Sequence, residues 1–295
     1  MTILLTGCRG QVGWELARTL APLGPIVALD AEGLNLADAH AIRRLVGEVR
    51  PRIIVNPAAH TAVDKAESEP ELARAINADG PAILAEEAEK LGALLVHYST
   101  DYVFDGTGAT PRGEEAPTGP LNVYGSTKLA GEEAIRDRCR RHLIFRTSWV
   151  YGARGANFLL TMRRLMGERP ELKIVDDQIG APTWCRHLAE ATALVLAQAL
   201  SPGRGADKPE PWGTYHLTNG GETSWHGFAA AIQALDAPEH PARLVPIPTT
   251  DYPTPARRPL NSRLDNGKLA RVFGVRLPDW REGLRLCLEK PRNGS

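Results

Sequence analysis

Short apolar runs alternate with longer amphipathic segments along the first half of the chain. The apolar runs are Ile3–Thr6, Ile26–Asp30, Arg52–Asn56, Leu94–Ser99 and His142–Arg146. A nearly continuous apolar run of this length is typical of a strand inside a sheet that is covered on both faces. Apolar residues recur at helical spacing in the segments between the runs, which include Gln11–Leu23, Ala39–Val49 and Pro81–Leu91. Strands and helices in alternation predict an α/β fold built on a doubly wound parallel sheet.

The pattern loosens after about residue 150. Proline and glycine gather in residues 201–213 and 238–259, as is typical of loops and surface excursions. A late strand at Thr214–Thr218 is expected to return to the main sheet. We therefore predict one domain at residues 1–150, to which residues 184–220 return. Residues 151–183 and 221–295 would form a smaller, discontinuous C-terminal lobe.

The composition is that of an ordinary globular protein. Of the 295 residues, 43% are hydrophobic and 24% are charged, which argues against a disordered chain. Lys and Arg total 35, and Asp and Glu total 35, so the formal net charge is zero. That balance argues against nucleic acid or an anionic membrane as a partner, because either would call for a basic surface.

The compartment can be predicted from what the sequence lacks. No apolar run reaches the roughly 18–20 residues that cross a bilayer, and the first residues do not resemble a signal peptide. The cysteines are scattered, without a CxxC pair, at Cys8, Cys139, Cys185 and Cys287. Such spacing argues against a disulfide scaffold or a structural zinc site. We expect a cytoplasmic protein with reduced thiols.

A glycine-rich loop follows the first predicted strand. Gly7, Gly10 and Gly13 form a GxxGxxG pattern directly before a predicted helix. Glycine allows a tight turn and a close approach to a diphosphate, and the helix N-terminus offers unpaired N–H groups and a positive dipole end. We predict a Rossmann-type dinucleotide site. On spacing alone, a glycine-rich turn that binds nothing is the alternative.

Asp30 ends the second predicted strand and supports the dinucleotide interpretation. An acidic residue at this distance from the loop accepts hydrogen bonds from the adenosine ribose. Its carboxylate repels the 2′-phosphate of NADP and so favours NAD. Arg9 in the glycine loop, and less directly Arg43, would offset that repulsion. We expect use of both cofactors, with a preference below about tenfold.

A second group of residues is suited to reducing a ketone. Tyr124 and Lys128 are four positions apart, so on a helix they share one face. An ammonium group near the phenol lowers the pKa of the tyrosine, which favours a general acid for ketone reduction. Thr100 closes a predicted strand and reaches the same sheet edge. By itself the Tyr/Lys pair is more typical of a solvated helix face, but the three features together favour a reductase.

The chain resembles the extended short-chain dehydrogenase/reductases and, within them, the dTDP-4-dehydrorhamnose reductase family. GxxGxxG and YxxxK are common to the superfamily, whereas the blocks VDKAESEP and STDYVF are similar to this family in particular. The matching stretches span almost the whole chain: Thr6–Leu16, Asn56–Pro70, His97–Asp105, Leu121–Glu132, Leu143–Tyr151, Asp176–Thr183 and Tyr252–Leu264.

The resemblance implies a role for each matching position, with NAD(P) bound by the first domain and the substrate by the smaller lobe. The catalytic residues would be Thr100, Tyr124 and Lys128. NADPH or NADH would be bound by Gly7, Gly10, Gln11, Val12, Gly13, Asp30, Asn35, Leu36, Ala59, His60, Thr61, Tyr98, Tyr124 and Lys128. The sugar nucleotide would be bound by Thr100, Asp101, Val103, Phe104, Trp149 and Arg257.

The implied reaction is NAD(P)H-dependent reduction of the C4 keto group of dTDP-4-dehydro-β-L-rhamnose to dTDP-L-rhamnose, a precursor of cell-surface polysaccharide such as lipopolysaccharide O-antigen. Two alternatives stay open. One is a reductase of another nucleotide sugar. The other is a non-catalytic, NADP-binding regulatory subunit similar to the methionine adenosyltransferase β-subunit. The intact Thr100, Tyr124 and Lys128 favour the enzyme.

Three groups of charged or aromatic residues have two interpretations each. Related enzymes form magnesium-bridged dimers through carboxylates, so the resemblance implies Glu15 as a Mg²⁺ ligand in a homodimer; a surface glutamate is the alternative. Arg257, with Arg258 and Arg263, either pairs with the substrate phosphates or belongs to a solvated basic loop. The remaining residues are more typical of hydrogen bonding or packing than of ligand binding: His60, His97, Trp184, Trp212, Trp225 and Trp280.

Overall fold

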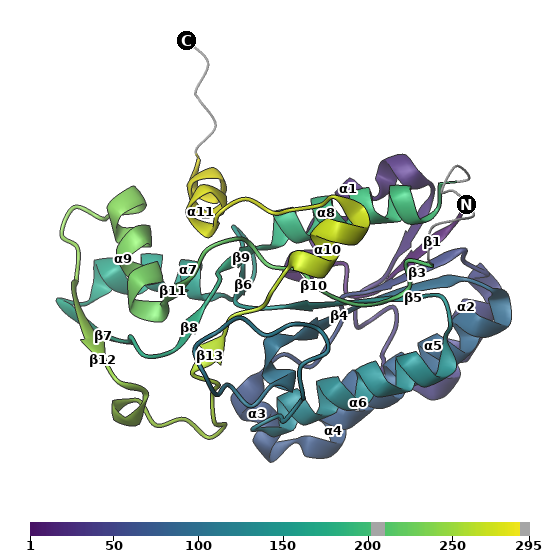
Figure 1. The fold of residues 1–295 in the computed structure, drawn as a ribbon, viewed down its shortest axis with the longest axis horizontal. Helices are drawn as coiled ribbons and strands as arrows, with labels where there is room; N and C mark the ends of the chain where they lie inside the picture. Colours follow the sequence, from purple (N-terminus) through teal and green to yellow (C-terminus); the bar gives the residue numbers. More distant parts are fainter. Residues whose placement is uncertain (202–209, 290–295) are drawn as a thin grey trace, which may run out of the picture.

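Six parallel strands form the central sheet of the computed structural model, which describes residues 1–201 and 210–289 (Figure 1). Their order across the sheet is β10-β5-β4-β3-β1-β2, and every neighbouring pair is parallel. The strands are β1 (Ile3–Leu5), β2 (Ile26–Ala28), β3 (Ile53–Asn56), β4 (Leu94–Thr100), β5 (His142–Thr147) and β10 (Gly213–His216). The predicted α/β fold with a doubly wound parallel sheet is confirmed, and all six predicted strands form within a few residues of their expected bounds.

Helices cover both faces of this sheet (Figure 1). One face carries α1 (Gln11–Thr19), α8 (Cys185–Ala199) and α10 (Gly267–Phe273), and the other carries α2 (Ala39–Val49), α5 (Gly80–Leu91) and α6 (Val123–Arg138). Successive side chains of a strand point to opposite faces. In β1, Ile3 and Leu5 therefore join the core under α1 and α8, whereas Leu4 joins the core under α2 and α5. All three are fully buried, which explains why the strands are apolar without alternation.

The first helix is shorter than the sequence predicts. The apolar spacing predicts a helix over Gln11–Leu23, but α1 ends at Thr19 and a 3₁₀ turn, Ala21–Leu23, follows it. Pro22 explains the difference, because proline lacks a backbone N–H and its ring crowds the preceding turn of an α-helix.

Three short helical segments that were not predicted connect β3 to α5. They are α3 (Val63–Ser68), α4 (Pro70–Arg74) and the π-helical turn Ala75–Asp79. Buried Asn77 in that turn donates from Nδ2 to the carbonyl oxygen of His60 at 3.1 Å and to Thr127 Oγ1 at 3.2 Å. This side chain therefore ties the loop after β3 to helix α6.

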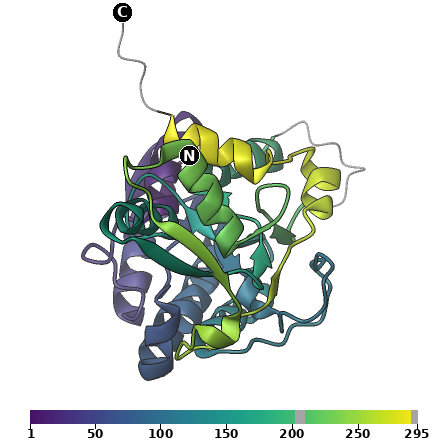
Figure 2. The same cartoon turned by 90° about the vertical axis from the view of Figure 1, so that its left-hand side faces the viewer.

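The smaller lobe is built from segments that lie far apart in the sequence, and Figure 2 turns it toward the viewer. Its helices are α7 (Phe158–Glu168), α9 (Trp225–Asp236) and α11 (Trp280–Leu288). Strand β7 (Glu171–Val175) pairs in parallel with β12 (Arg243–Ile247). Five short strands form two further small sheets, ordered β11-β8-β13 and β6-β9. They are β6 (Val150–Tyr151), β8 (Ile179–Gly180), β9 (Thr183–Trp184), β11 (Thr223–Ser224) and β13 (Asn261–Ser262). The lobe has an apolar core of its own, with Phe228 and Trp280 near its centre.

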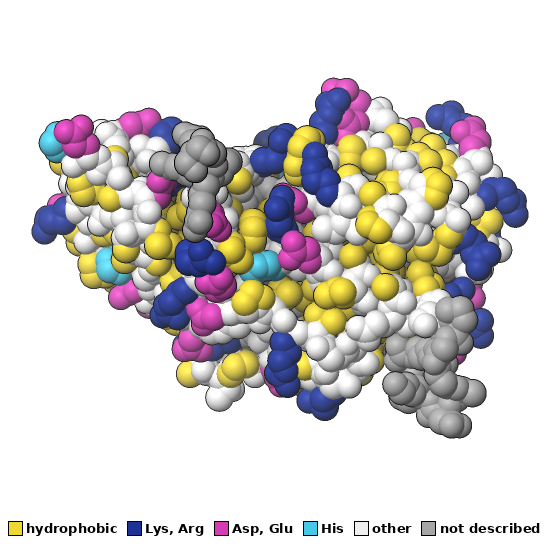
Figure 3. Space-filling model, turned by 90° about the horizontal axis from the view of Figure 1, so that it is seen from above, with side chains coloured by type: hydrophobic (Ala, Val, Ile, Leu, Met, Phe, Trp, Pro, Cys, Tyr) yellow, Lys and Arg dark blue, Asp and Glu magenta, His cyan; other side chains and the backbone are white. Residues whose placement is uncertain are grey.

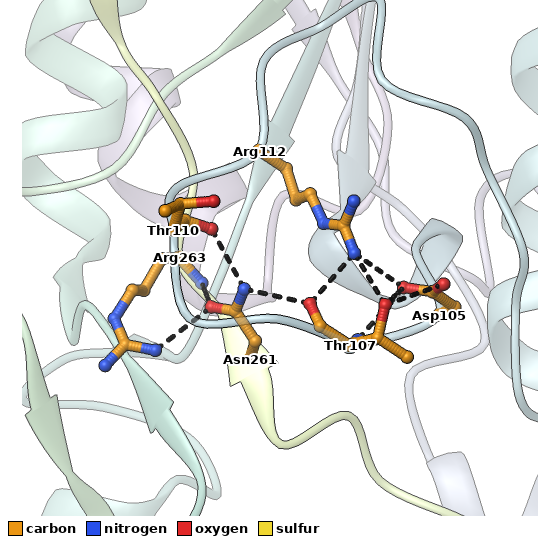
Figure 4. A network of polar contacts seen from close by, with 6 residues as sticks. All are labelled: Asp105, Thr107, Thr110, Arg112, Asn261 and Arg263. Atoms are coloured by element: carbon orange, nitrogen blue, oxygen red, sulfur yellow. Dashed lines mark hydrogen bonds and ion pairs between the residues drawn. The ribbon is translucent and has the colours of Figure 1, made fainter.

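The long connection from β4 to α6 is pinned to the segment around β13 by the polar network in Figure 4. Asn261 donates from Nδ2 to the carbonyl oxygen of Thr110 at 2.9 Å and to that of Thr107 at 3.3 Å. Arg112 binds Asp105 Oδ1 and Thr107 Oγ1 at 2.9 and 2.8 Å. These contacts place the smaller lobe against the loop that directly follows the strand end carrying Thr100.

On the face shown in Figure 3, basic and acidic side chains are interspersed rather than gathered into one patch. Among residues 1–201 and 210–289, no helix is long and apolar enough to span a membrane. All four cysteines carry unpaired thiols.

Candidate active site

A cleft of about 800 Å³ opens above the carboxyl ends of the sheet strands, between the sheet and the smaller lobe. In parallel α/β sheets this edge is where ligands bind. One end is lined by the glycine loop, and the other by the ends of β4 and β5, the start of α6 and the start of α9. Most of the predicted site residues line it: Gly7, Gly10, Gln11, Val12, Gly13, Asp30, Asn35, Leu36, Ala59, Thr61, Tyr98, Thr100, Asp101, Tyr124, Lys128 and Trp149.

The glycine loop has the geometry that a diphosphate requires. Gly7 has a φ of 56°, and the N–H of Gly10 donates to its carbonyl oxygen at 2.9 Å, which closes the turn. A Cβ at Gly13 would lie 2.1 Å from that same oxygen, so a larger residue would break the turn. Helix α1 begins at Gln11 without a side-chain cap, and its first N–H groups face the cleft. An anion is the ligand that such a helix end favours.

Asp30 lies where the sequence predicts it, at the edge of the cleft beyond β2. Its Oδ1 accepts hydrogen bonds from the N–H groups of Glu32 and Gly33, and its Oδ2 pairs with Arg9 Nε at 2.7 Å. The Gly33 hydrogen bond, helped by Arg9, lowers the pKa of this carboxyl. Arg43 does not take part, because Glu86 and Glu87 hold it at 2.7 Å each.

Thr100, Tyr124 and Lys128 converge at the other end of the cleft. Thr100 ends β4, while Tyr124 and Lys128 lie one turn apart on α6, which Asn122 caps by accepting from the N–H of Gly125. Burial raises the pKa of Tyr124 to about 12, while its hydrogen bond with Thr100 acts in the opposite direction. Lys128 is not among the causes of this shift, so the lowering of the Tyr124 pKa by Lys128 stays a prediction.

The ammonium of Lys128 is directed away from the phenol. It donates to the carbonyl oxygen of Tyr98 at 2.6 Å and contacts His97 Nε2 at 3.1 Å. Burial lowers the pKa of Lys128 to about 8, although the carboxylate of Glu132 opposes the shift.

The comparisons with known proteins agree with this geometry. The family model described as "RmlD substrate binding domain" matches residues 1–293. The chain is 50% identical over 294 residues to the dTDP-4-dehydrorhamnose reductase of Burkholderia thailandensis, covering 98% of each chain. The chain belongs to the dTDP-4-dehydrorhamnose reductase family. It is also 49% identical to the Escherichia coli K12 protein of the same name, again over 98% of each chain.

Solved structures of family members have the same fold. The Clostridium acetobutylicum reductase superposes with a TM-score of 0.90 at 36% identity, covering 98% of each chain. The Bacillus anthracis reductase, solved in complex with NADP, gives a TM-score of 0.89 at 35% identity and covers 97% of this chain and 98% of its own. The chain is therefore an oxidoreductase of the nicotinamide-dependent kind.

Asp101 lies at the boundary between the two halves of this enzyme. Its Oδ1 accepts from Thr100 Oγ1 at 3.1 Å, and its side chain is 2% exposed. Burial raises the pKa of Asp101 to about 6, although hydrogen bonds with Ser262 and Thr100 oppose that rise. Ser262 comes from β13, so a residue of the smaller lobe contacts the carboxyl beside Thr100.

Five predicted site residues do not line the cleft: Val103, Phe104, His60, Arg257 and Glu15. Val103 and Phe104 turn into a small apolar core with Leu264, because the 3₁₀ turn after Thr100 directs them beneath the surface of the cleft. A direct contact between either of them and the sugar nucleotide is not supported by this placement. His60 contacts Glu69 at 3.4 Å, and its N–H donates to Asn77 Oδ1, so the cofactor contact predicted for it is not supported either.

The three arginines near the C-terminus are not equivalent. Arg258 pairs with Asp64 at 2.7 Å, and Arg263 pairs with Glu222 at 2.6 Å. Arg257 is exposed, and its carbonyl oxygen accepts from Asn122 Nδ2 at 2.7 Å, which holds it beside the start of α6. Of the three, Arg257 is thus the one whose guanidinium no carboxylate in the described part of the chain engages.

Glu15 is mostly buried and pairs with Arg186 at 3.1 Å. Within residues 1–201 and 210–289, no group of three or more His, Cys, Asp or Glu residues is arranged to hold a metal ion. The alternative of a surface glutamate is wrong, because Glu15 is buried. The magnesium-bridged homodimer stays a prediction.

Sequence reasoning missed residues of the smaller lobe that line the cleft. Trp225 was interpreted as a packing residue, yet it lines the cleft beside Trp149. Ala156 lines it as well, held by a loop in which Asn157 Nδ2 donates to Gln11 Oε1 at 2.8 Å. No local pattern marks these positions, because long-range packing brings them to the site.

Proposed function

We propose that this enzyme reduces the C4 keto group of dTDP-4-dehydro-β-L-rhamnose to give dTDP-L-rhamnose, with NADPH or NADH as reductant. The observation that carries the proposal is a single cleft with a diphosphate-shaped glycine loop at one end and Thr100, Tyr124 and Lys128 at the other. The activity for which the family's members are named supports the same substrate.

The residues at the first end of the cleft fit a nicotinamide dinucleotide. The turn at Gly7 and Gly13 leaves no room for side chains, and the uncapped start of α1 offers N–H groups to a diphosphate. Asp30 would bind the adenosine ribose, with Asn35 and Leu36 beside the adenine. The cofactor would then pass Ala59, Thr61 and Tyr98 on its way to the end of the cleft that holds Tyr124. When bound, the cofactor supplies a hydride there.

The chain's own residues would handle the proton. Tyr124 donates its phenolic proton to the C4 oxygen of the sugar, so that no alkoxide builds up. Thr100 donates a hydrogen bond to the same oxygen and orients it. Lys128 binds the nicotinamide ribose, and in that position its charge lowers the pKa of Tyr124 from the raised value that burial imposes.

Cofactor choice would be set by Asp30 and Arg9. The carboxylate already accepts three hydrogen bonds or ion pairs, so its repulsion of a 2′-phosphate is partly neutralised. Arg9 is largely exposed and is able to turn toward a 2′-phosphate. We therefore propose that both NADH and NADPH are used.

The smaller lobe would bind the sugar nucleotide. Asp101 and Trp149 line the cleft near the reacting residues, and Arg257 lies beside the start of α6, where its guanidinium is available to the substrate diphosphate. Residues 1–150 with 184–220 would hold the cofactor, and residues 151–183 with 221–295 the substrate. We place the reaction in the cytoplasm, which supplies reduced cofactor and keeps unpaired thiols such as Cys139 reduced.

A coupled assay tests the proposal. An enzymatic supply of dTDP-4-dehydrorhamnose is added to the purified chain, and the absorbance of NADH or NADPH is followed. We expect oxidation of both cofactors with this substrate and formation of dTDP-L-rhamnose. No oxidation with any dTDP-linked keto sugar would contradict the proposal and favour a regulatory subunit; oxidation only with another nucleotide sugar would correct the substrate.

A further inference from the structure

Two tryptophans from different halves of the molecule are stacked in the wall of the cleft. The indole rings of Trp149 and Trp225 lie with their centroids 3.7 Å apart and their planes at 12°. Trp149 follows β5 of the main sheet, whereas Trp225 opens α9 in the smaller lobe. Both line the cleft.

The backbone of Trp149 is strained to place its ring there. Its φ is 49°, a left-handed conformation that bulky residues rarely adopt. Its carbonyl oxygen accepts from the N–H of Thr183 at 3.1 Å, which fixes the turn. A Cβ at Gly180 would lie 2.8 Å from Cε2 and 3.1 Å from Cζ2 of this indole, so only glycine leaves room for the ring. Strain of this kind persists only where the surrounding structure imposes it, and it is enriched at ligand sites.

Other residues of the smaller lobe hold the indole of Trp225 in place. Its Nε1 donates to Gln178 Oε1 at 3.1 Å, and the ring of Phe158 packs against it with centroids 4.7 Å apart. Gln178 is anchored in turn by donating from Nε2 to Thr249 Oγ1 at 3.1 Å. The lobe thus offers a fixed aromatic surface to the strained indole of Trp149.

The position of Trp149 indicates which part of a ligand it meets. Thr147 pairs with Thr100 across β4 and β5, and Trp149 follows Thr147 by two residues. The indole therefore lies at the same strand ends as the reacting hydroxyls, where the sugar must sit. A flat aromatic face suits the C–H groups and the methyl group on one side of a 6-deoxyhexose.

We propose that Trp225 is a positioning residue that holds Trp149 as the wall against which the deoxyhexose ring packs, and that Gly180 provides the space this arrangement needs. The inference rests on the proposed function, because it names how that substrate's sugar is held. The smaller lobe would then set affinity for the sugar nucleotide through the stack, without touching the proton donor or the cofactor.

The first test replaces Trp225 with Leu and with Phe, and uses Trp212→Leu as the matched control, since Trp212 packs against the main core outside the cleft. We expect Trp225→Leu to raise KM for the sugar nucleotide by about tenfold, the effect of losing a stacked aromatic partner, while kcat falls less than about threefold. Cofactor Kd is expected to stay unchanged. Trp225→Phe restores most of the affinity, and Trp212→Leu leaves KM unchanged.

A second variant moves Trp149 without removing any aromatic ring. The methyl group of Gly180→Ala would press on the indole and also on Ser262. Gly167→Ala is its control, because a Cβ at Gly167 would make only an ordinary contact, 3.8 Å from Pro238, outside the cleft. We expect Gly180→Ala to raise the same KM and Gly167→Ala not to. Circular dichroism adds a readout apart from activity: the coupled signal of two stacked indoles disappears in Trp225→Leu and Trp225→Phe but persists in Trp212→Leu.

The outcomes separate this inference from the proposed function. If wild-type enzyme turns over the substrate and Trp225→Leu leaves KM unchanged, the inference is overturned and the function stands. The inference is also overturned if Trp225→Leu mainly lowers kcat or weakens cofactor binding. It is likewise overturned if Trp225→Phe does not restore the affinity for the sugar nucleotide. If wild-type enzyme oxidises no cofactor with any dTDP-linked keto sugar, the function itself fails and the inference fails with it.

Discussion

The sheet half and the smaller lobe both contribute residues to the cleft, but they position those residues in different ways. In the sheet half, Gly7, Asp30 and Thr100 lie at or just after the ends of β1, β2 and β4, so each of these predicted site positions follows a strand that the sequence reveals. In the lobe, the contributing strands are two residues long, and β8 pairs with β11 and β13, which are more than 40 and 80 positions away in the chain. Residues at the ends of regular elements are thus predictable, whereas those placed by long-range packing are not.

The same contrast separates chemistry from substrate recognition. The proposed proton donor Tyr124, Lys128 and the glycine loop belong to the sheet half. Trp225, which stacks on Trp149, and Ser262, which contacts Asp101, belong to the lobe. Substitutions in the sheet half are therefore expected to lower turnover or cofactor affinity. Substitutions in the lobe are expected to lower the affinity for the sugar nucleotide.

The largest effect is expected for the sheet half, in Tyr124→Phe. Only the proton donor is lost, so kcat falls by about 10²–10⁴-fold while the fold and cofactor affinity are kept. Tyr102→Phe is the matched control, because Tyr102 packs edge-on against Tyr124 with centroids 5.5 Å apart. Steady-state kinetics of both variants make the comparison, and a near-normal kcat in Tyr124→Phe would remove this residue from its role.

Asp101→Asn probes the boundary between the halves through pH-dependent stability. The pKa of Asp101 is raised to about 6 in the folded chain, against 3.8 for the unperturbed carboxyl. The folded state therefore holds this proton longer, and the contribution of Asp101 to stability falls as pH rises from 4 to 7. Relative to the Asn variant, the loss between pH 4 and 7 amounts to roughly 2 kcal/mol. Urea unfolding of the ligand-free proteins at both pH values measures it; parallel pH profiles would contradict the burial of a titrating carboxyl here.

Lys128→Met tests whether one lysine serves both cofactor binding and turnover. A charge-assisted hydrogen bond to the ribose contributes about 1.5–3 kcal/mol, so cofactor Kd is expected to rise by at least about tenfold, and kcat to fall as well. Lys268→Met is the control, since Lys268 donates to the carbonyl oxygen of Thr214 away from the cleft. A fall in kcat with unchanged cofactor affinity would show that Lys128 does not bind the ribose.

The smallest effect is expected for Asp30→Ala, which alters cofactor choice only. Removing the carboxylate removes both the repulsion of a 2′-phosphate and the ribose hydrogen bonds, so kcat/KM shifts toward NADPH by up to about tenfold. Asp38→Ala is a suitable control, because Asp38 caps α2 and does not line the cleft. An unchanged ratio of the two kcat/KM values would mean that Asp30 does not face the ribose.

The sequence predicts the sheet half well for a physical reason. Strands buried on both faces must be apolar throughout, so β1, β3 and β4 stand out from the polar segments around them. Gly7 and Gly13 follow from backbone geometry that only glycine tolerates. Tyr124 and Lys128 follow from helical spacing once α6 is recognised.

Other features depend on tertiary contacts that the sequence does not encode locally. The raised pKa of Tyr124 arises from burial, and Lys128 turns toward Tyr98 and His97 because those groups lie nearest to it. Val103 and Phe104 share the STDYVF block with Thr100, but the 3₁₀ turn at Asp101–Val103 directs them into a core instead. The division into cofactor and substrate domains stays a prediction.

Isotope transfer tests the central claim most directly. The chain is incubated with dTDP-4-dehydrorhamnose and a reduced cofactor in which deuterium replaces both hydrogens on C4 of the nicotinamide. The product is then examined by NMR. If the cleft aligns the cofactor with the sugar as proposed, the product is dTDP-L-rhamnose with one deuterium at C4 of the sugar. A product without deuterium at that carbon, or the absence of any reduced sugar, would contradict the account.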